Sequence, residues 1–117
     1  MLVVDDIAEQ REIYEVLFTH AGLRVLEAKD GETAVALAQA HLPDVVLLDI
    51  CLPDVDGYEV IRRLKADERT RRIAIVLLTA CAFPDDELAR DADYDEFLVK
   101  PIHPRDALAA VQRQLRG

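Results

Sequence analysis

Cysteine, long apolar stretches and positive charge are all scarce in this chain of 117 residues. Its two cysteines, Cys51 and Cys81, are too few for a disulfide framework or a four-ligand zinc site. No apolar stretch approaches the roughly 20 residues that a membrane-spanning helix needs, and the N-terminus lacks the basic and then apolar pattern of a signal peptide. We therefore expect neither a secreted disulfide scaffold nor a membrane protein, and take the cytoplasm as the expected location.

The formal net charge of −9 argues against two classes of partner. Nucleic acid phosphates and anionic membrane surfaces would both be repelled. Hydrophobic residues make up 51% of the chain, which favours a globular protein over a disordered segment. The length suits one core, so we expect a single domain over residues 1–117 without internal repeats or linkers.

Short apolar runs alternate with segments of helical periodicity along the chain. The runs are rich in β-branched residues and bounded by Asp, Pro or Gly, as in strands buried on both faces of a parallel sheet. The expected strands, in chain order, are 2–4, 24–27, 45–48, 73–78 and 97–99. Strict alternation with helices predicts βαβ units, right-handed crossovers and a three-layer α/β sandwich.

Five helices are expected between and after these strands. The first would bury Ile13, Val16 and Leu17 on one face and end at Gly22. Tyr14 and Phe18 are expected to pack in the core or on the helix face. The other helices are expected over 33–40 after the cap Asp30, around Val60, Ile61 and Leu64, from Pro84, and after Pro104 with a stripe of Leu108, Val111 and Leu115.

Four of the apolar runs end on polar residues. Asp5 and Asp6 follow the first run, Asp49 the third, Thr79 the fourth and Lys100 the fifth. In an open parallel sheet, ligands bind beyond the carboxyl ends of the strands, where the strand order reverses. We therefore expect these five side chains to converge in one crevice.

Three carboxylates in one crevice require a cation or a raised pKa. Two unit negative charges about 4 Å apart repel by roughly 4 kcal/mol at an effective dielectric near 20. Oxygen ligands alone suit Mg²⁺ with retained waters. A carboxylate can also attack phosphorus and form an aspartyl phosphate, whose oxygens would face the metal ion, the Thr79 hydroxyl and the Lys100 ammonium. The residue types thus predict a phosphoryl acceptor, without a general base for hydrolysing a separate substrate.

Four motifs carry a resemblance to a known family: "VVDD", "LLDICLPDVDG", "VLLTA" and "FLVKP", in this order. Over essentially its whole length the chain resembles the receiver domain of bacterial two-component response regulators, the CheY-like family. The resemblance implies a doubly wound, flavodoxin-like fold with a five-stranded parallel sheet in the order 2-1-3-4-5 and helices on both faces. It also implies a signalling domain that is not an enzyme in the usual sense, because it promotes only its own phosphorylation and dephosphorylation. A histidine kinase or a histidine phosphotransfer protein would donate the phosphoryl group, and a partner or an output domain would receive the signal.

The resemblance assigns a role to each matching residue. Asp49 would be the phosphoacceptor. Mg²⁺, for which Mn²⁺ can substitute, would be held by Asp5, Asp6, Asp49 and the backbone carbonyl of Cys51. The phosphoryl-binding and switch residues would be Thr79, Ala80, Phe97 and Lys100, and the structural ones Gly57 and Pro101, the latter after a cis peptide bond. Cys51 and Cys81 would tune the lifetime of the phosphoryl group.

The chain departs from the family at Asp93, Tyr94 and Ile102, and the segment between Thr79 and Lys100 is about one residue shorter. These departures leave the expected chemistry intact and concern the face that family members present to partners. The arginines between residues 62 and 72 are interpreted as a solvated face.

Two other interpretations stay open. A metal-dependent phosphatase of the dehalogenase-like kind would need a second aspartate where this chain has Cys51, and a longer chain. A degenerate receiver that serves only as a binding module would lack a site residue, and none is missing.

The expected assembly is a monomer or a weak, phosphorylation-dependent dimer. The sequence leaves open the cognate kinase, the output, and whether the regulator is free-standing or part of a larger protein.

Overall fold

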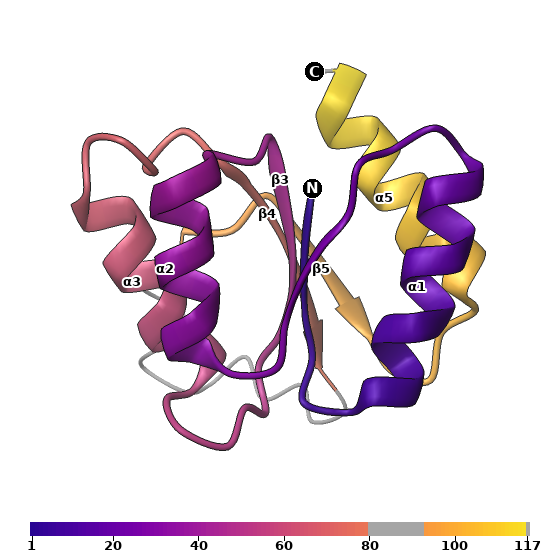
Figure 1. Cartoon of the computed structure of the whole chain (residues 1–117), viewed down its shortest axis with the longest axis horizontal. Helices are drawn as coiled ribbons and strands as arrows, with labels where there is room; N and C mark the ends of the chain where they lie inside the picture. The colour runs from indigo at the N-terminus through magenta and orange to yellow at the C-terminus, as the bar shows by residue number, and fades with distance from the viewer. Residues whose placement is uncertain (80–92, 117) are drawn as a thin grey trace.

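The computed structural model describes residues 1–79 and 93–116 and shows a parallel sheet between two layers of helices (Figure 1). The five strands lie in the order β2-β1-β3-β4-β5, as expected. They are β1 Leu2–Val4, β2 Leu26–Ala28, β3 Val45–Asp49, β4 Ala74–Thr79 and β5 Glu96–Val99. The described helices are α1 Ala8–His20, α2 Gly31–His41, α3 Gly57–Ala66 and α5 Pro104–Arg116. The helix expected from Pro84 lies outside the described residues. No helix in the described ranges is both long and apolar enough to cross a membrane.

Successive strand residues pack against opposite helical layers. In Figure 1, α2 and α3 lie on one side of the sheet, and α1 and α5 on the other. One core cluster joins the first pair of helices to Leu2, Val4, Val46, Leu48, Ile75 and Leu77. The other joins the second pair to Val3, Val45, Leu47, Val76 and Leu78. The central strands are thus apolar on both faces, so a charged residue is tolerated only at the end of a strand, where its side chain can leave the apolar layers.

The edge strands are less buried than the central ones. Every residue of β3 is at most 5% exposed, whereas β2 and β5 are only partly buried. Burial on both faces was therefore wrongly predicted for β2 and β5, because an edge strand has one neighbour and less cover from the helices. The predicted start of β2 at residue 24 was also wrong, because Leu26, opposite Leu2, is the first residue that pairs with β1.

The buried face of α1 differs from the predicted one. Tyr14 and Phe18 are 3% and 0% exposed, whereas Ile13 and Val16 are 45% and 61% exposed. The prediction was wrong for these two residues, while Leu17 packs partly buried against the core. The rings of Tyr14 and Phe18 stack with centroids 5.6 Å apart. Burying two aromatic rings removes more apolar surface from water than burying Ile13 and Val16 would.

Helix α5 packs on the sheet mainly through small residues. Ala107, Ala110 and Val111 are fully buried, whereas Leu108 is partly buried and Leu115 is 41% exposed. The predicted stripe was therefore right for Val111, partly right for Leu108 and wrong for Leu115. The contact with the sheet is thus made by the first and middle turns of α5, and Leu115 in the last turn lies largely outside it.

The helix ends follow the predicted capping residues. Gly22 has a φ of 90°, and the amides of Gly22 and Leu23 donate to the carbonyls of Thr19 and Phe18, closing α1 in a Schellman motif. The Asp30 side chain caps α2 by accepting from the Thr33 amide at 2.8 Å. The three apolar residues expected on α3 are buried: Val60, Ile61 and Leu64.

The packing of α1 predicts unequal costs for truncating its apolar residues. Phe18→Ala should lower the free energy of unfolding by about 3–5 kcal/mol, because it leaves a cavity in a filled core. Val16→Ala should change it by no more than about 0.5 kcal/mol, because this side chain is largely exposed. Urea unfolding of the two variants measures both, and equal losses would contradict the assigned face.

Candidate functional site

Three aspartates meet at the carboxyl ends of the two central strands β1 and β3. Asp5 and Asp6 directly follow β1, and Asp49 is the last residue of β3. Each offers one carboxylate oxygen, and these oxygens lie within 4.8 Å of one another. Asp5 and Asp49 are buried and Asp6 is exposed. We call these three residues the acidic cluster; their convergence is the one expected from the strand ends.

Lys100, directly after β5, supplies positive charge to the acidic cluster. Its Nζ lies 2.9 Å from Oδ2 of Asp49 and 3.5 Å from Oδ2 of Asp5, and the side chain is 22% exposed. Burial by itself would lower the pKa of Lys100, but the hydrogen bond and charge of Asp49, together with the charge of Asp5, outweigh it and raise this pKa. Lys100 is therefore a fixed cation within the site.

The backbone orients the two buried carboxylates. Oδ1 of Asp5 accepts from the Ile7 amide, and Oδ1 of Asp49 accepts from the Cys51 amide, each at 2.9 Å. The second oxygen of each carboxylate faces Lys100. Burial raises the pKa of Asp5, with smaller additions from the charges of Asp49 and Asp6, against the opposing effects of the Ile7 amide and Lys100. Keeping Asp5 ionised in this site therefore costs free energy.

The donor set fits a hard divalent cation. Oδ2 of Asp5 is buried and has no hydrogen-bond partner among the described residues, apart from the ion pair with Lys100. One ammonium faces three carboxylates, so negative charge remains in excess. Carboxylate oxygens are the ligands that Mg²⁺ prefers in proteins, and an orphaned buried oxygen gains from a nearby cation. Asp6 and Asp49, supported by Asp5, would hold the ion together with the Cys51 carbonyl on the adjoining loop.

Arg11 and Tyr14 adjoin the cluster although the sequence predicted no role there for either. Nη1 of Arg11 donates to the backbone carbonyl of Asp5 at 2.7 Å, and its Nε lies 3.5 Å from a carboxylate oxygen of Glu27 on β2. Burial raises the pKa of Tyr14, opposed by the charge of Lys100. Both residues lie on α1, which begins just after the loop that follows β1. No local pattern in the sequence signals such contacts.

The other predicted site residues lie close to the same edge of the sheet. Phe97 is partly buried on β5 and packs against Tyr94, with ring centroids 5.7 Å apart. Gly57 is buried, and a Cβ there would lie 2.7 Å from the Ile50 Cα, so this position requires glycine. The bond before Pro101 is cis, as the resemblance implied.

The structure describes the remaining predicted site residues in part. Thr79 ends β4, with its backbone opposite Val99. The side chain of Thr79, and the whole of Ala80 and Cys81, lie outside the described residues. The side chain of Cys51 is exposed.

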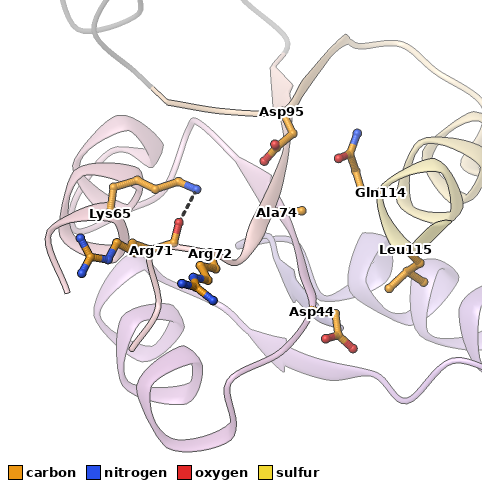
Figure 2. Close-up of a pocket in the computed structure, with 8 residues that line it drawn as sticks. All are labelled: Asp44, Lys65, Arg71, Arg72, Ala74, Asp95, Gln114 and Leu115. Carbon is orange, nitrogen blue, oxygen red and sulfur yellow. Dashed lines mark hydrogen bonds between the residues drawn. The ribbon is translucent and has the colours of Figure 1, made fainter. Parts of the chain in front are cut away.

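A hollow of about 620 Å³ lies at the opposite, amino-terminal edge of the sheet (Figure 2). Ala74, the first residue of β4, lines it, with Lys65, Arg71 and Arg72 to one side. Nζ of Lys65 donates to the carbonyls of Arg71 and Ile73, and Arg71 pairs with Glu68 at 3.4 Å. Three arginines nearby also pair with carboxylates: Arg62, Arg63 and Arg69. These contacts agree with the interpretation of a solvated face, and the hollow is remote from the acidic cluster.

Comparison with known proteins yields one family. The family model described as "Response regulator receiver domain" matches residues 1–112. The chain is 42% identical over 103 residues to the response regulator PleD of Caulobacter vibrioides, covering 87% of this chain and 23% of that protein. It is 38% identical over 117 residues to the phosphate regulon transcriptional regulatory protein PhoB of Pseudomonas aeruginosa, covering 99% of this chain and 51% of that protein. The chain thus spans about half or less of the length of these relatives.

Solved structures show the same fold. The receiver domain of the sensor histidine kinase PA1611 from Pseudomonas aeruginosa, which has a magnesium ion coordinated in its active site cleft, superposes with a TM-score of 0.89 at 32% identity. The match covers 99% of this chain and 96% of that chain. The chemotaxis protein CheY4 of Vibrio cholerae superposes with a TM-score of 0.87 at 29% identity, covering 96% of this chain and 94% of that chain.

The crowding of carboxylates predicts that the site destabilises the metal-free protein. Asp5→Asn keeps the acceptor for the Ile7 amide and removes one close negative charge, so in EDTA it should raise the free energy of unfolding by on the order of 1 kcal/mol. Adding Mg²⁺ should stabilise the parent more than the variant. Urea unfolding with EDTA or with Mg²⁺ measures both effects. A variant less stable than the parent in EDTA would show that repulsion does not dominate this site.

Proposed function

This chain belongs to the response regulator receiver domain family, and from that premise we propose that Asp49 accepts a phosphoryl group in a reaction that depends on Mg²⁺. One observation carries the proposal. Asp49 is a buried carboxylate whose Oδ1 is held by the Cys51 amide, while its Oδ2 lies 2.9 Å from Lys100 Nζ and beside Asp5 and Asp6. An oriented nucleophile, a fixed cation and a set of metal ligands are thus brought to one point.

The geometry favours Asp49 over its two neighbours as the nucleophile. Asp6 is exposed, and Asp5 is held twice: its carboxylate accepts from the amide of Ile7, the N-cap residue of α1, and its backbone carbonyl accepts from Arg11. Among these three aspartates, Asp49 alone accepts a hydrogen bond from the Lys100 ammonium. As that oxygen bonds to phosphorus, Lys100 is already placed to transfer its hydrogen bond to a phosphoryl oxygen and stabilise the charge that develops there. Bound Mg²⁺ would supply further charge neutralisation at the same oxygens.

The donor and the readout follow from the family as further proposals. A histidine kinase or a histidine phosphotransfer protein in the cytoplasm would supply the phosphoryl group, and an output domain or partner would read the change. Residues 1–117 would act as one receiver domain, with Mn²⁺ able to replace Mg²⁺. Switching through Thr79 and Phe97 would require Phe97 to leave Tyr94, the ring it now contacts.

Incubation with acetyl phosphate and Mg²⁺ should add one phosphoryl group to the parent, detected by intact-mass spectrometry. Asp49→Asn should abolish the gain, and EDTA should suppress it. The matched control is Asp44→Asn, because Asp44 is an exposed carboxylate that precedes the opposite end of the same strand. Turnover of acetyl phosphate without a gain in mass would favour a phosphatase, and no reaction at all would favour a binding module.

Cys51 should govern how long the phosphoryl group persists. Its side chain is exposed and follows Asp49 by two residues, so we expect it to rim the crevice through which an attacking water would enter; a compact thiol orients water poorly. Cys51→Lys should therefore slow dephosphorylation roughly tenfold by occlusion, if about 1.4 kcal/mol is added to the barrier. Decay of purified phosphoprotein measures this rate. Rates equal to the parent's in both Cys51→Lys and Cys81→Lys would show that neither cysteine rims the site.

A further inference from the structure

The loop between β3 and α3, residues 50–56, is joined to a distant helix by one carboxylate. Oδ1 of Asp54 accepts from the Gly31 amide at 2.8 Å, and Oδ2 accepts from the Glu32 amide at 2.9 Å. The third amide of α2, that of Thr33, donates to the local cap Asp30. The free N–H groups of the first turn of α2 are therefore satisfied by two carboxylates, and the larger share comes from a residue more than 20 positions away.

Close packing supports the same junction. Gly31 is buried, and a Cβ added there would lie 2.2 Å from Cγ2 of Val55 and 3.0 Å from Cγ2 of Val60. Gly31 lies within α2 and has no positive φ, so what glycine provides here is space for a close approach. The loop thus packs onto the first turn of α2 through both a charged and an apolar contact.

This loop also carries groups of the acidic cluster. The Cys51 amide, three residues before Asp54, holds Oδ1 of Asp49, and the Cys51 carbonyl is the proposed metal ligand. At the far end of the loop, the Gly57 amide returns to the Ile50 carbonyl at 2.8 Å. A displacement of the loop at Asp54 would therefore move the Cys51 peptide group.

The other side of the junction is fixed beside the cluster as well. Helix α2 follows β2, and the carbonyl of Ala28 at the end of β2 accepts from the Asp5 amide at 3.1 Å. Asp54 thus connects the loop that holds Asp49 to the segment that holds Asp5. Desolvation by itself would raise the pKa of Asp54, but the hydrogen bonds from backbone amides, those of Gly31 and Glu32 first, together outweigh it and lower this pKa to about 2, so the carboxylate stays ionised at neutral pH.

We propose that Asp54 is a positioning residue of the phosphoacceptor site: by docking residues 50–56 on the first turn of α2, it holds the Cys51 peptide group where that group orients Asp49 and meets the divalent cation. This inference rests on the proposed function for the cation and on the described contacts for the docking. Partners that orient metal ligands from outside the ligand set commonly change metal affinity about tenfold or more when removed.

Two variants disturb the junction in different ways, and a third serves as control. Asp54→Ala removes the carboxylate, whereas Gly31→Ala introduces a methyl group against Val55 and leaves every charge in place. The control Asp56→Ala removes a carboxylate from the same loop, but that carboxylate caps α3 through the Glu59 amide at 2.9 Å. Loss of charge and loss of a helix cap are thus matched between Asp54→Ala and Asp56→Ala.

The first readout is the amide and carbonyl chemical shifts of residues 49–53 in EDTA, and the second is the dissociation constant for Mg²⁺ from a titration. Asp54→Ala and Gly31→Ala should both shift the Cys51 signals and weaken Mg²⁺ binding about tenfold. Asp56→Ala should leave the Cys51 signals in place and weaken binding less than about twofold, since its carboxylate is exposed and its charge is screened by solvent and salt. If Asp54→Ala does not fold, Asp54→Asn replaces it; one acceptor remains, so its effect should be intermediate.

Equal effects of Asp54→Ala and Asp56→Ala on Mg²⁺ binding would overturn the inference, as would a Gly31→Ala variant that matches the parent in both readouts. Failure of the proposed function is seen separately, in a parent chain that takes up neither Mg²⁺ nor a phosphoryl group. In that case the metal-free shifts of Cys51 decide the positioning role.

Discussion

The ion pair between Asp49 and Lys100 is the contact on which the site depends. It joins the ends of β3 and β5, which β4 separates in the sheet, across 51 residues of sequence. The distance of 2.9 Å depends on the registers of three paired strands, β3, β4 and β5, of which β3 and β4 pack apolar side chains on both faces. Packing of the hydrophobic core thus fixes the strand ends that carry Asp49 and Lys100, and the two charged side chains meet as a consequence.

The excess of negative charge gives the site its chemistry. An acidic cluster with one ammonium is poorly neutralised, and burial makes the ionised state of Asp5 costly. A protein selected for stability alone would avoid such an arrangement, so the strain marks a site that is completed by what it binds. A divalent cation would supply the missing positive charge, and the cation and Lys100 together would then face the negative oxygens that a phosphoryl group brings. The loops around the cluster, held by Arg11 and Asp54, keep those oxygens in place before either ligand arrives.

Much of this could be predicted from the sequence, because the signals were local or followed from the sheet. Apolar runs marked the strands, Asp30 and Gly22 marked helix ends, and the parallel order brought Asp5 and Asp49 together. The predictions failed where tertiary packing decided. On α1, the face with the aromatic residues Tyr14 and Phe18 is buried instead of the face with Ile13 and Val16. Strand β2 begins at Leu26, the first residue that pairs with β1. The contacts of Arg11 and Asp54 join distant segments, so neither periodicity nor a motif could reveal them.

A crystal structure of the chain with Mg²⁺ and beryllofluoride tests the central claim most directly. Beryllofluoride mimics a phosphoryl group on a carboxylate, so it marks the nucleophile without chemical turnover. The account predicts density for it on a carboxylate oxygen of Asp49, with Nζ of Lys100 on one fluorine and Mg²⁺ between Asp6, Asp49 and the Cys51 carbonyl. Density on another aspartate, or a cation away from this cluster, would contradict the account.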